Sequence, residues 1–321
     1  MTVLSLPPVP SRDRNRPLAV VVVTYNSADT LGGLLDTFAD GLEGFDDTEV
    51  VIADNASSDN SVELALAHPV GARVVHTGWN GGYAAGINAA LATIRADADV
   101  LILNPDIRLS PGAAARLVEV LRHGDIGVVA PRIVHQDGAP YHSLRREPSL
   151  QTAWADALLG TRLGAGIDKG ECVCDSACYE TPRVVDWASG AALMISAEVR
   201  ARVGAWDETF FLYSEEVDFQ RRARAAGYRV AYTPHAQVLH FGGDYQSNPR
   251  LYAILTANRI RDYARHHGAV STALFRTAVL TGEVLRSLGG SAVHRAGAIA
   301  ALRRLPERHV TRPQLVEAGQ Q

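Results

Sequence analysis

A seven-residue run without a charged side chain, Leu18–Thr24, is the feature that most constrains the fold. The run reads LAVVVVT, and a continuous apolar stretch rich in β-branched valine is typical of a strand covered on both faces in a parallel sheet. Similar short runs follow at Val50–Ala53, Arg73–His76, Val100–Leu103 and Ile126–Ala130. Segments with helical periodicity separate these runs, and such alternation requires crossover connections. The pattern therefore predicts an α/β domain with a mostly parallel central sheet that is flanked by helices.

The 321 residues divide into three regions. Residues 1–16 contain three prolines and three arginines but no apolar core of the signal-peptide kind, so we expect a disordered lead-in. Residues 17–267 carry the alternating pattern, which dissolves between about 131 and 183, where we expect a long irregular loop. Residues 268–321 are predicted to form a helical extension. A helical pattern already begins near residue 248, and its expected breaks are Gly268 and the Gly289-Gly290 pair.

The composition argues against several classes of protein. A formal net charge of −4 argues against a general nucleic-acid binder, which is usually basic. No apolar run of about 18 residues is present, so we expect no membrane-spanning helix and predict a cytoplasmic protein. All three cysteines, Cys172, Cys174 and Cys178, lie in one short segment. They offer three thiolates to a metal, but their spacing fits no standard zinc pattern, so we interpret the segment as a reduced loop.

An acid follows the apolar run Val100–Leu103, in the segment Asn104-Pro105-Asp106. A buried strand that ends in this way carries a carboxylate to the edge of the sheet. In open α/β sheets, ligands bind at the edge where the carboxyl ends of the strands lie. We therefore expect Asp106 to face a ligand.

Small polar side chains also end the first two predicted strands. Thr24, Tyr25 and Asn26 close the first strand, and Asp54 and Asn55 close the second. Adjacent parallel strands that end in such residues fit a nucleotide site at a topological switch point. The Asp54 carboxylate would accept a hydrogen bond from the N3–H of uracil or thymine, a group that cytosine lacks. The alternative is that Asp54 only ends a strand.

A glycine-rich turn, residues 78–88, leads into the next predicted helix. Its candidate ligand-binding residues are Asn80, Gly81, Gly82, Gly86 and Asn88. Such a turn lets the backbone approach a diphosphate and direct N–H groups at it. The segment matches neither the dinucleotide-binding fingerprint nor the phosphate-binding loop of nucleotide triphosphatases. The competing interpretation is a common Asn-Gly turn with no ligand.

An acid pair and a histidine stand at the edges of later segments. Glu215 and Glu216 begin a predicted helix, and His240 ends an apolar run. Neighbouring residues of a helix point about 100° apart, so one carboxylate can face a cleft as a general base while the other caps the helix or stays in solvent. Asp106 and His240 are candidate ligands of Mg²⁺ or Mn²⁺. His240 on its own would also fit a structural histidine at a strand end.

Seven segments together resemble the inverting glycosyltransferases of family 2, in their rhamnosyltransferase-like branch. They are VVTYN at residues 22–26, ADNASSD at 53–59, NGGYAAG at 80–86, LNPD at 103–106, WASGAALM at 187–194, FLYSEEVD at 211–218 and VLH at 238–240. Each segment is unspecific alone, but their order is specific. The resemblance covers about residues 18–267.

The resemblance implies a GT-A type nucleotide-diphospho-sugar transferase fold. Residues 17–130 would bind the nucleotide, with Asp54 beside its nucleobase. Residues 131–267 would bind the acceptor. Asn104-Pro105-Asp106 matches the family's Asp-x-Asp metal motif, and its first acid is replaced by Asn104. His240 matches a third metal ligand. Glu216 matches the catalytic base, although the family's usual residue is the shorter aspartate.

The implied reaction is a single displacement. Glu216 would deprotonate an acceptor hydroxyl, and a cation on Asp106 and His240 would neutralise the leaving diphosphate. The acceptor side would be shaped by Trp187, Ser189 and Gly190. The donor would be a dTDP- or UDP-linked sugar, with dTDP-L-rhamnose favoured by the branch. The acceptor would be a glycan or a polyprenyl-linked glycan.

Two other classes of function are also consistent with a nucleotide half of this kind. One is a nucleotidylyltransferase or sugar-nucleotide hydrolase, and the other is a non-catalytic sugar-nucleotide-binding protein. The acid pair and the histidine of the second half favour transfer.

The last segment of the chain differs in charge from the rest. Residues 269–321 contain seven arginines (Arg276, Arg286, Arg295, Arg303, Arg304, Arg308 and Arg312) but only three acids (Glu283, Glu307 and Glu317). Basic amphipathic helices of this type bind anionic membrane surfaces. We expect peripheral contact with the inner face of the cell membrane, or a homodimer formed through these helices.

Overall fold

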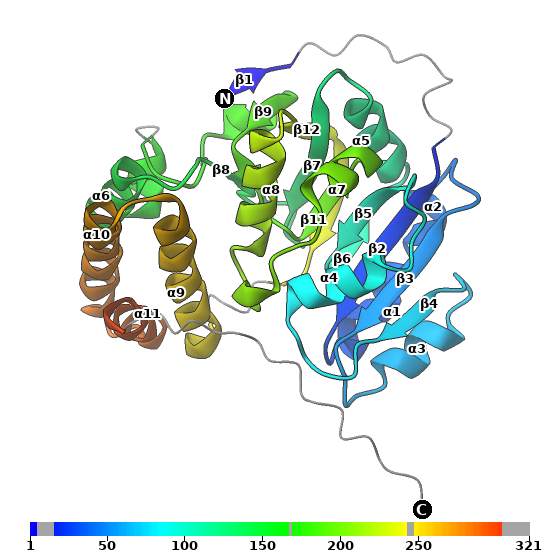
Figure 1. Cartoon of the computed structure of the whole chain (residues 1–321), viewed down its shortest axis with the longest axis horizontal. Coiled ribbons are helices and arrows are strands. Elements are labelled where there is room, and N and C mark those ends of the chain that lie inside the picture. The colour runs from blue at the N-terminus through cyan, green and yellow to red at the C-terminus, as the bar shows by residue number, and fades with distance from the viewer. Residues whose placement is uncertain (5–15, 167–168, 243–246, 304–321) are drawn as a thin grey trace, which may run out of the picture.

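The structure is a computed structural model, which describes residues 1–4, 16–166, 169–242 and 247–303, with only the backbone for 161–166. It consists of a mixed β-sheet with helices on both faces and a group of helices beside it (Figure 1). The expected α/β fold with a helical C-terminal region is therefore confirmed.

Four parallel strands form one half of the sheet. They are β2 (Leu18–Thr24), β3 (Glu49–Asp54), β4 (Arg73–His76) and β5 (Asp99–Leu103), in the order β5-β2-β3-β4. Every residue of β2 and β5 is buried, which explains why both runs lack polar alternation. The chain moves outward from β2 through β3 to β4 and then returns to the other side of β2 as β5. The switch point therefore lies between β2 and β5.

Helices cover both faces of the sheet. One face packs against α1 (Ala28–Leu35), α2 (Phe38–Gly41), α3 (Ser61–Ala67) and α5 (Ala113–Leu121). The other face packs against α4 (Tyr83–Leu91), α7 (Ala197–Val203) and α8 (Glu215–Ala225). Alternate residues of β2 separate the two cores, with Val20 and Val22 in the first and Val21 and Val23 in the second.

Antiparallel strands enter the second half of the sheet. The strand β11 (Ala192–Ile195) lies antiparallel between β5 and β7 (Ile126–Val134). The long strand β12 (Arg229–His240) runs parallel to β7, with a register shift between Thr233 and Gln237. At the edge, β9 (Arg183–Val185) and β1 (Thr2–Val3) complete the sheet.

Two short strand pairs position the candidate site. The strand β6 (Ile107–Leu109) pairs with the end of β12, so that Ile107 is opposite His240. The strands β8 (Leu144–Arg145) and β10 (Trp187–Ala188) form a separate two-stranded sheet, in which Arg145 is opposite Trp187. Short 3₁₀ helices, at Ser176–Tyr179 and Glu208–Phe210, flank these regions.

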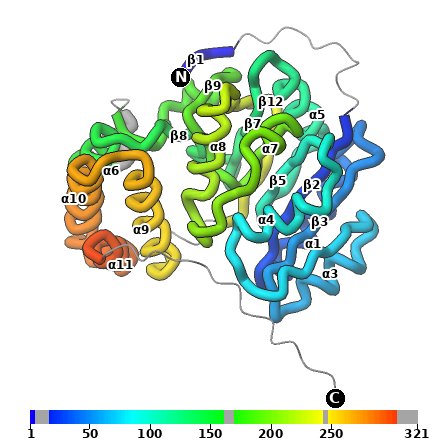
Figure 2. Tube along the Cα trace, in the orientation of Figure 1, coloured from blue at the N-terminus to red at the C-terminus, as the bar shows by residue number. Residues whose placement is uncertain are grey.

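The helices outside the sheet have a core of their own. They are α6 (Leu150–Gly166), α9 (Pro249–His266), α10 (Ala269–Ser287) and α11 (Ala292–Leu302), and they stand beside α8 in Figures 1 and 2. Their shared core includes Ile260, Phe275 and Ala301. The breaks expected at Gly268 and at Gly289-Gly290 are confirmed, because these residues separate α9, α10 and α11.

Helix α6 lies where we expected an irregular loop, so that expectation was wrong. Its helical turns are interrupted by a kink at Gly160, which has φ 71° and ψ 164°. Because the kink divides α6, its residues do not follow one continuous amphipathic period. Tertiary packing on α10 stabilises the helix instead. An ion pair between Asp156 and Arg259 also connects α6 to α9.

No helix in the described ranges is long and apolar enough to cross a membrane. Helix α10 and its C-cap residue Leu288 nevertheless expose a row of apolar side chains. Val270, Leu274, Leu285 and Leu288 are each at least 46% exposed. Three of the seven arginines noted above, Arg304, Arg308 and Arg312, lie outside the described residues.

Candidate active site

A cavity of about 550 Å³ lies between the sheet, the start of α8 and helix α9. Six of the residues predicted from the sequence line it: Asn104, Asp106, Trp187, Ser189, Glu216 and His240. They come from the end of β5, from β10 and the turn after it, from the first turn of α8 and from the end of β12. The fold thus gathers the predicted metal ligands, the predicted base and the predicted acceptor-side residues around one space.

Asp106 and His240 lie next to each other at the edge of the sheet. The Asp106 Oδ2 atom is 3.3 Å from the His240 Nε2 atom. The antiparallel pairing of β6 with β12 causes this contact, because Ile107 is opposite His240. The other atoms of the pair, Asp106 Oδ1 and His240 Nδ1, are buried and have no hydrogen-bond partner among the residues that the structure describes.

The surroundings of this pair fit a bound divalent cation. A carboxylate and an imidazole suit Mg²⁺ or Mn²⁺, and a ligand would satisfy the buried atoms that have no partner. Gly242 leaves space beside them, since a Cβ atom at this position would lie 1.9 Å from Asp106 Oδ2 and 3.1 Å from His240 Nε2. The Tyr141 ring packs edge-on against His240, with ring centroids 5.4 Å apart, and fixes the imidazole plane.

A second group of possible ligand atoms lies nearby. Single ligand atoms of Asp218, Asp262 and His266 lie within 4.8 Å of one another. Both carboxylates already have arginine partners, at 2.8 Å from Arg222 to Asp218 and 2.6 Å from Arg221 to Asp262. These ion pairs account for the two buried acids without a cation.

The two adjacent glutamates have different surroundings. Glu216 lines the cavity, and burial raises the pKa of its carboxyl to about 7. Hydrogen bonds from backbone N–H groups and the positive charge of Arg145 lower the pKa of Glu216, but the effect of burial is larger. A carboxylate with a pKa near neutrality is matched to proton transfer at physiological pH.

Glu215 does not line the cavity, and of the two alternatives expected for the second carboxylate, the helix cap or solvent, the structure contradicts solvent. It is only 2% exposed, and within the described part of the chain its Oε2 atom has no hydrogen-bond partner. Burial, followed by repulsion from Glu216, raises the pKa of Glu215 well above its usual range. Burial therefore disfavours the charged form of the Glu215 carboxyl, and of the two acids only Glu216 lines the cavity.

The polar residues at the ends of β2 and β3 form a continuous network. The Asp54 carboxylate accepts hydrogen bonds from the Thr24 hydroxyl at 3.0 Å and from the Ser57 N–H at 3.0 Å. The Asn26 side chain accepts from the Ser58 N–H at 2.8 Å. Tyr25, in contrast, exposes 52% of its surface beside this network.

The glycine-rich turn has roles inside the protein. A Cβ atom on Gly82, which has φ +89°, would lie 1.9 Å from the Phe211 carbonyl oxygen, and one on Gly86 would lie 2.4 Å from Val23 Cγ1. Gly81 is similarly crowded, since its Cβ would lie 2.7 Å from Ala85. These glycines therefore allow α4 and its turn to pack closely on β2 and on the loop before α8.

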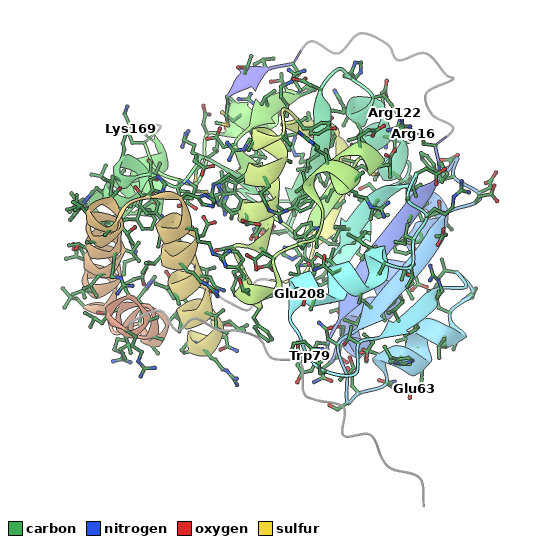
Figure 3. All side chains as sticks on the ribbon, viewed as in Figure 1. Arg16, Glu63, Trp79, Arg122, Lys169 and Glu208 are labelled. Carbon is green, nitrogen blue, oxygen red and sulfur yellow. The ribbon has the colours of Figure 1, made fainter. Side chains whose placement is uncertain are left out.

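The asparagines around this turn also bond within the protein. The Asn55 amide donates to the Gly82 carbonyl at 2.9 Å, and Asn80 Oδ1 accepts from the Gly82 N–H at 3.1 Å. Asn88 donates to the Trp206 carbonyl and to Glu208, and it accepts from the Trp206 N–H. Figure 3 labels Glu208, a partner of Asn88, and Trp79, which belongs to the turn before α4. Asn88 thus has partners within the protein, and its predicted contact with a ligand stays a prediction.

The cysteine segment forms part of the cavity wall. Cys172 lines the cavity, and its Sγ atom is 3.2 Å from that of Cys174. The hydrogen bond from Cys174 and the nearby Arg145 charge lower the pKa of the Cys172 thiol to about 7, against the effect of burial. Among the described residues, the three cysteines form no group of three potential metal ligands.

Comparisons with known proteins agree with this geometry. Residues 19–178 match the sequence profile described as "Glycosyl transferase family 2". The chain is similar to the N-acetylglucosaminyl-diphospho-decaprenol L-rhamnosyltransferase of Mycobacterium tuberculosis, at 31% identity over 70% of this chain and 75% of the relative. The chain belongs to glycosyltransferase family 2.

Two further similarities are consistent with this membership. The family 2 glycosyltransferase described here is 24% identical to the rhamnosyltransferase WbbL of Escherichia coli, over 69% of this chain and 82% of the relative. Its fold resembles that of the mannosyltransferase PcManGT from Pyrobaculum calidifontis, solved with GDP-Man and Mn²⁺. That match has a TM-score of 0.59 at 17% identity and covers 92% of this chain and 88% of the other. The rhamnosyltransferase-like branch and the GT-A fold are thus confirmed, and the chain is an enzyme of glycosyl transfer.

Glu216, the predicted catalytic base, lies in the first turn of α8, directly after a strained loop. Phe211, Tyr213 and Ser214 all have positive φ values, of 66°, 68° and 76°. Residues other than glycine rarely adopt this conformation, and each such residue costs about 1–3 kcal/mol. Surrounding contacts must therefore hold the loop, and with it the first turn of α8.

Two buried amides hold this region, and neither was identified from the sequence. The Asn258 side chain, on α9, donates to the carbonyls of Phe210, Leu212 and Tyr213 at 2.6, 2.8 and 3.3 Å. The Gln220 side chain, on α8, accepts from the Ala188 N–H at 2.9 Å and donates to the Ala188 carbonyl at 2.8 Å. A single amide on a helix has no distinguishing sequence pattern, because its partners are backbone groups of distant segments.

We predict that Asn258→Ala lowers turnover by about tenfold or more and also lowers the melting temperature. The variant leaves the loop carbonyls without their donor, which costs about 1–3 kcal/mol, and releases the strained loop that orients Glu216. Asn248→Ala is the matched control, because Asn248 caps the same helix through the Arg250 and Leu251 N–H groups. It should lower stability by about 1 kcal/mol with little change in turnover. Equal losses of turnover in both variants would contradict a specific role for Asn258.

Proposed function

We propose that the enzyme transfers L-rhamnose from dTDP-L-rhamnose, with inversion, to a hydroxyl of a polyprenyl-diphosphate-linked glycan. The observation that carries this proposal is the cavity that contains the Asp106–His240 pair and the Glu216 carboxylate together. The names of the two rhamnosyltransferase relatives support the sugar, and the diphospho-decaprenol name of the first supports the acceptor.

Glu216 acts as the general base in this proposal. Its carboxylate takes the proton of the acceptor hydroxyl, whose oxygen forms a bond to the anomeric carbon. The bond from that carbon to the diphosphate oxygen breaks at the same time, and the leaving diphosphate keeps the electron pair. The acceptor attacks from the face opposite the diphosphate, so the anomeric configuration inverts.

Asp106 and His240 would hold Mg²⁺ or Mn²⁺, with Asn104 lining the same part of the cavity. A divalent cation supplies neutralisation of the negative charge on the leaving diphosphate. The protein contributes the fixed geometry of the pair, which is set by the pairing of β6 with β12. A solved fold relative contains Mn²⁺, which supports a cation in this fold.

The nucleotide would bind across the carboxyl ends of β2 and β3, within residues 17–130. Asp54 stands there with a carboxylate that already accepts from Thr24 and Ser57, and Tyr25 offers an exposed ring. Asn26 and Asn55 complete the polar edge. A base with an N3–H donor, such as thymine or uracil, complements this acceptor.

The acceptor would bind to the half of the catalytic domain that residues 131–267 form. Trp187 lies on β10, and Ser189 and Gly190 follow that strand, beside Glu216, the proposed catalytic base. A Cβ atom on Gly190 would lie 3.2 Å from Glu216 Cβ, so this glycine keeps the approach to the carboxylate open. The Tyr83 hydroxyl donates to the Gly190 carbonyl at 3.2 Å and fixes this segment.

We predict that Asp106→Ala abolishes metal-dependent transfer while the fold stays intact. The substitution removes a ligand at a strand end without emptying the core, so the melting temperature should change little. His240→Ala should weaken metal and donor binding in the same assay. Transfer of labelled sugar from dTDP-L-rhamnose, with and without a chelator, is the measurement. Full activity of Asp106→Ala, or wild-type activity that a chelator leaves unchanged, would refute the metal site.

We predict that Glu216→Gln lowers turnover by about 10²–10⁴-fold and leaves donor affinity near the wild-type value. The amide keeps the shape of the side chain but accepts no proton. In the wild type, kcat/KM should rise with pH and level off above a midpoint near 7, because burial raises the pKa of Glu216 to about 7 and only the carboxylate is active.

The thiol of Cys172 titrates in the same range, so the pH profile needs a control. Cys172→Ser should keep the same midpoint if Glu216 determines it. Donor binding, measured by calorimetry, should be similar in wild type and Glu216→Gln. If Glu215→Gln is inactive and Glu216→Gln has normal activity, the catalytic base is Glu215 and the assignment to Glu216 is wrong.

We also propose that α10 contacts the membrane surface that carries the acceptor. Its exposed apolar row supports this, because Val270 and Leu288 are 77% and 78% exposed. We predict that the enzyme co-sediments with anionic liposomes at low salt and less at high salt. Leu274→Asp combined with Leu285→Asp should reduce binding without loss of transfer to a water-soluble acceptor. Absence of binding at low salt would contradict membrane contact and leave a homodimer, which light scattering would detect.

A further inference from the structure

One arginine of the cavity has a cysteine thiol, and no carboxylate at ion-pair distance, as its acidic partner among the described residues. Arg145 lines the cavity from β8, and its Nη1 atom donates to the carbonyls of His142 and Leu144 and to Cys172 Sγ, the last at 3.3 Å. In the part of the chain that the structure describes, it forms no ion pair with a carboxylate. Its guanidinium also lies over the Trp187 ring, 5.8 Å from the centroid.

The other arginine of the cavity wall is neutralised. Arg259 contacts Glu171 at 2.7 Å and Asp156 at 3.2 Å. A guanidinium held away from bulk water is stabilised when an anion lies beside it, and its planar donors match the oxygens of a phosphate. The contrast between the two arginines therefore indicates that an anionic ligand completes the surroundings of Arg145.

The position of Arg145 identifies which part of a substrate reaches it. Arg145 is opposite Trp187 in the β8–β10 pair, on the side of the cavity that we assign to the acceptor. The Asp106–His240 pair, which we assign to the donor diphosphate, belongs to the other strand pair, β6–β12. The same cavity is also lined by apolar residues, namely Pro148, Leu212, Leu251 and Leu255. A cation beside apolar side chains suits a diphosphate joined to a hydrocarbon chain.

We infer that Arg145 forms an anion subsite for the diphosphate of the lipid-linked acceptor. This inference rests on the proposed function, because it assigns a part of the proposed acceptor to a residue. It adds a specificity element: an acceptor that lacks the diphosphate loses a charge-assisted hydrogen bond, while the donor keeps its own contacts.

Cys172 provides a direct measure of occupancy. Its thiol is 3.3 Å from Arg145 Nη1 and lines the cavity, so a ligand bound to Arg145 should shield it from an alkylating reagent. The chain has three cysteines, and Cys174→Ser with Cys178→Ser leaves Cys172 as the sole thiol. The rate of its alkylation by iodoacetamide can then be followed by mass spectrometry, without any transfer reaction.

Three probes separate the sources of the phosphate. Geranyl diphosphate should slow the alkylation of Cys172 by about tenfold at saturation, and geraniol, which lacks the phosphates, should not. The nucleotide dTDP with Mg²⁺ should have little effect. The same measurement is made on an Arg145→Met variant of the sole-thiol protein, as the ratio of its alkylation rates with and without geranyl diphosphate. This ratio should show no protection. Arg145→Lys should keep part of the protection, and Arg95→Met, an exposed control, should keep all of it.

Steady-state kinetics give the second measurement. Arg145→Met should raise the KM for a lipid-diphosphate acceptor about tenfold or more and leave the KM for the donor within about twofold, since a hydrogen bond to a charged group contributes about 1.5–3 kcal/mol. Protection by dTDP with Mg²⁺ equal to that by geranyl diphosphate, together with a raised donor KM, would overturn the inference in favour of the donor. Absence of protection by every probe would overturn it as well.

The two levels of the proposal can fail separately. If geranyl diphosphate protects Cys172 through Arg145 but no nucleotide sugar supports transfer, the anion subsite stands and the proposed reaction is wrong. If transfer proceeds but Arg145→Met changes neither protection nor acceptor KM, the reaction stands and the subsite is wrong.

Discussion

The pairing of β6 with the end of β12 is the constraint on which the candidate site depends. It places Ile107 opposite His240 and so brings Asp106 to within 3.3 Å of the imidazole. Side chains alternate between the two faces of a strand, so a shift of one residue in this register would turn His240 away from Asp106. The pairing in turn requires β12 to run the full distance from Arg229 to His240, past the register shift after Thr233.

The helices outside the sheet participate directly in the arrangement of the base. Asn258 on α9 holds the strained loop before Glu216, and other residues of the same helix line the cavity. The helical core, through Ile260 and Phe275, fixes α9 in place. Changes in this core should therefore influence turnover as well as stability. Helix α9 thus supports both the loop before Glu216 and part of the cavity wall.

Electrostatic balance in the cavity distinguishes structural from functional charges. Arg259 contacts both Asp156 and Glu171, and Arg221 contacts Asp262, so each of these groups has an oppositely charged partner within the protein. Glu216 and Arg145 are different, because neither has an oppositely charged partner at ion-pair distance among the described residues. Burial raises the pKa of Glu216 to about 7, which suits proton transfer, and the guanidinium of Arg145 suits a phosphate.

The sequence by itself determined the parallel strands β2 to β5, because each is a short apolar run between helical segments, and it determined the acids and polar residues at their ends. It also determined the family, through seven segments in order. Only the tertiary structure decided that β11 enters antiparallel between β5 and β7, that Glu215 is buried, that Asn88 bonds to Trp206, and that α6 replaces a loop. These features depend on contacts between distant segments, whereas local periodicity reports only which face of a segment is apolar.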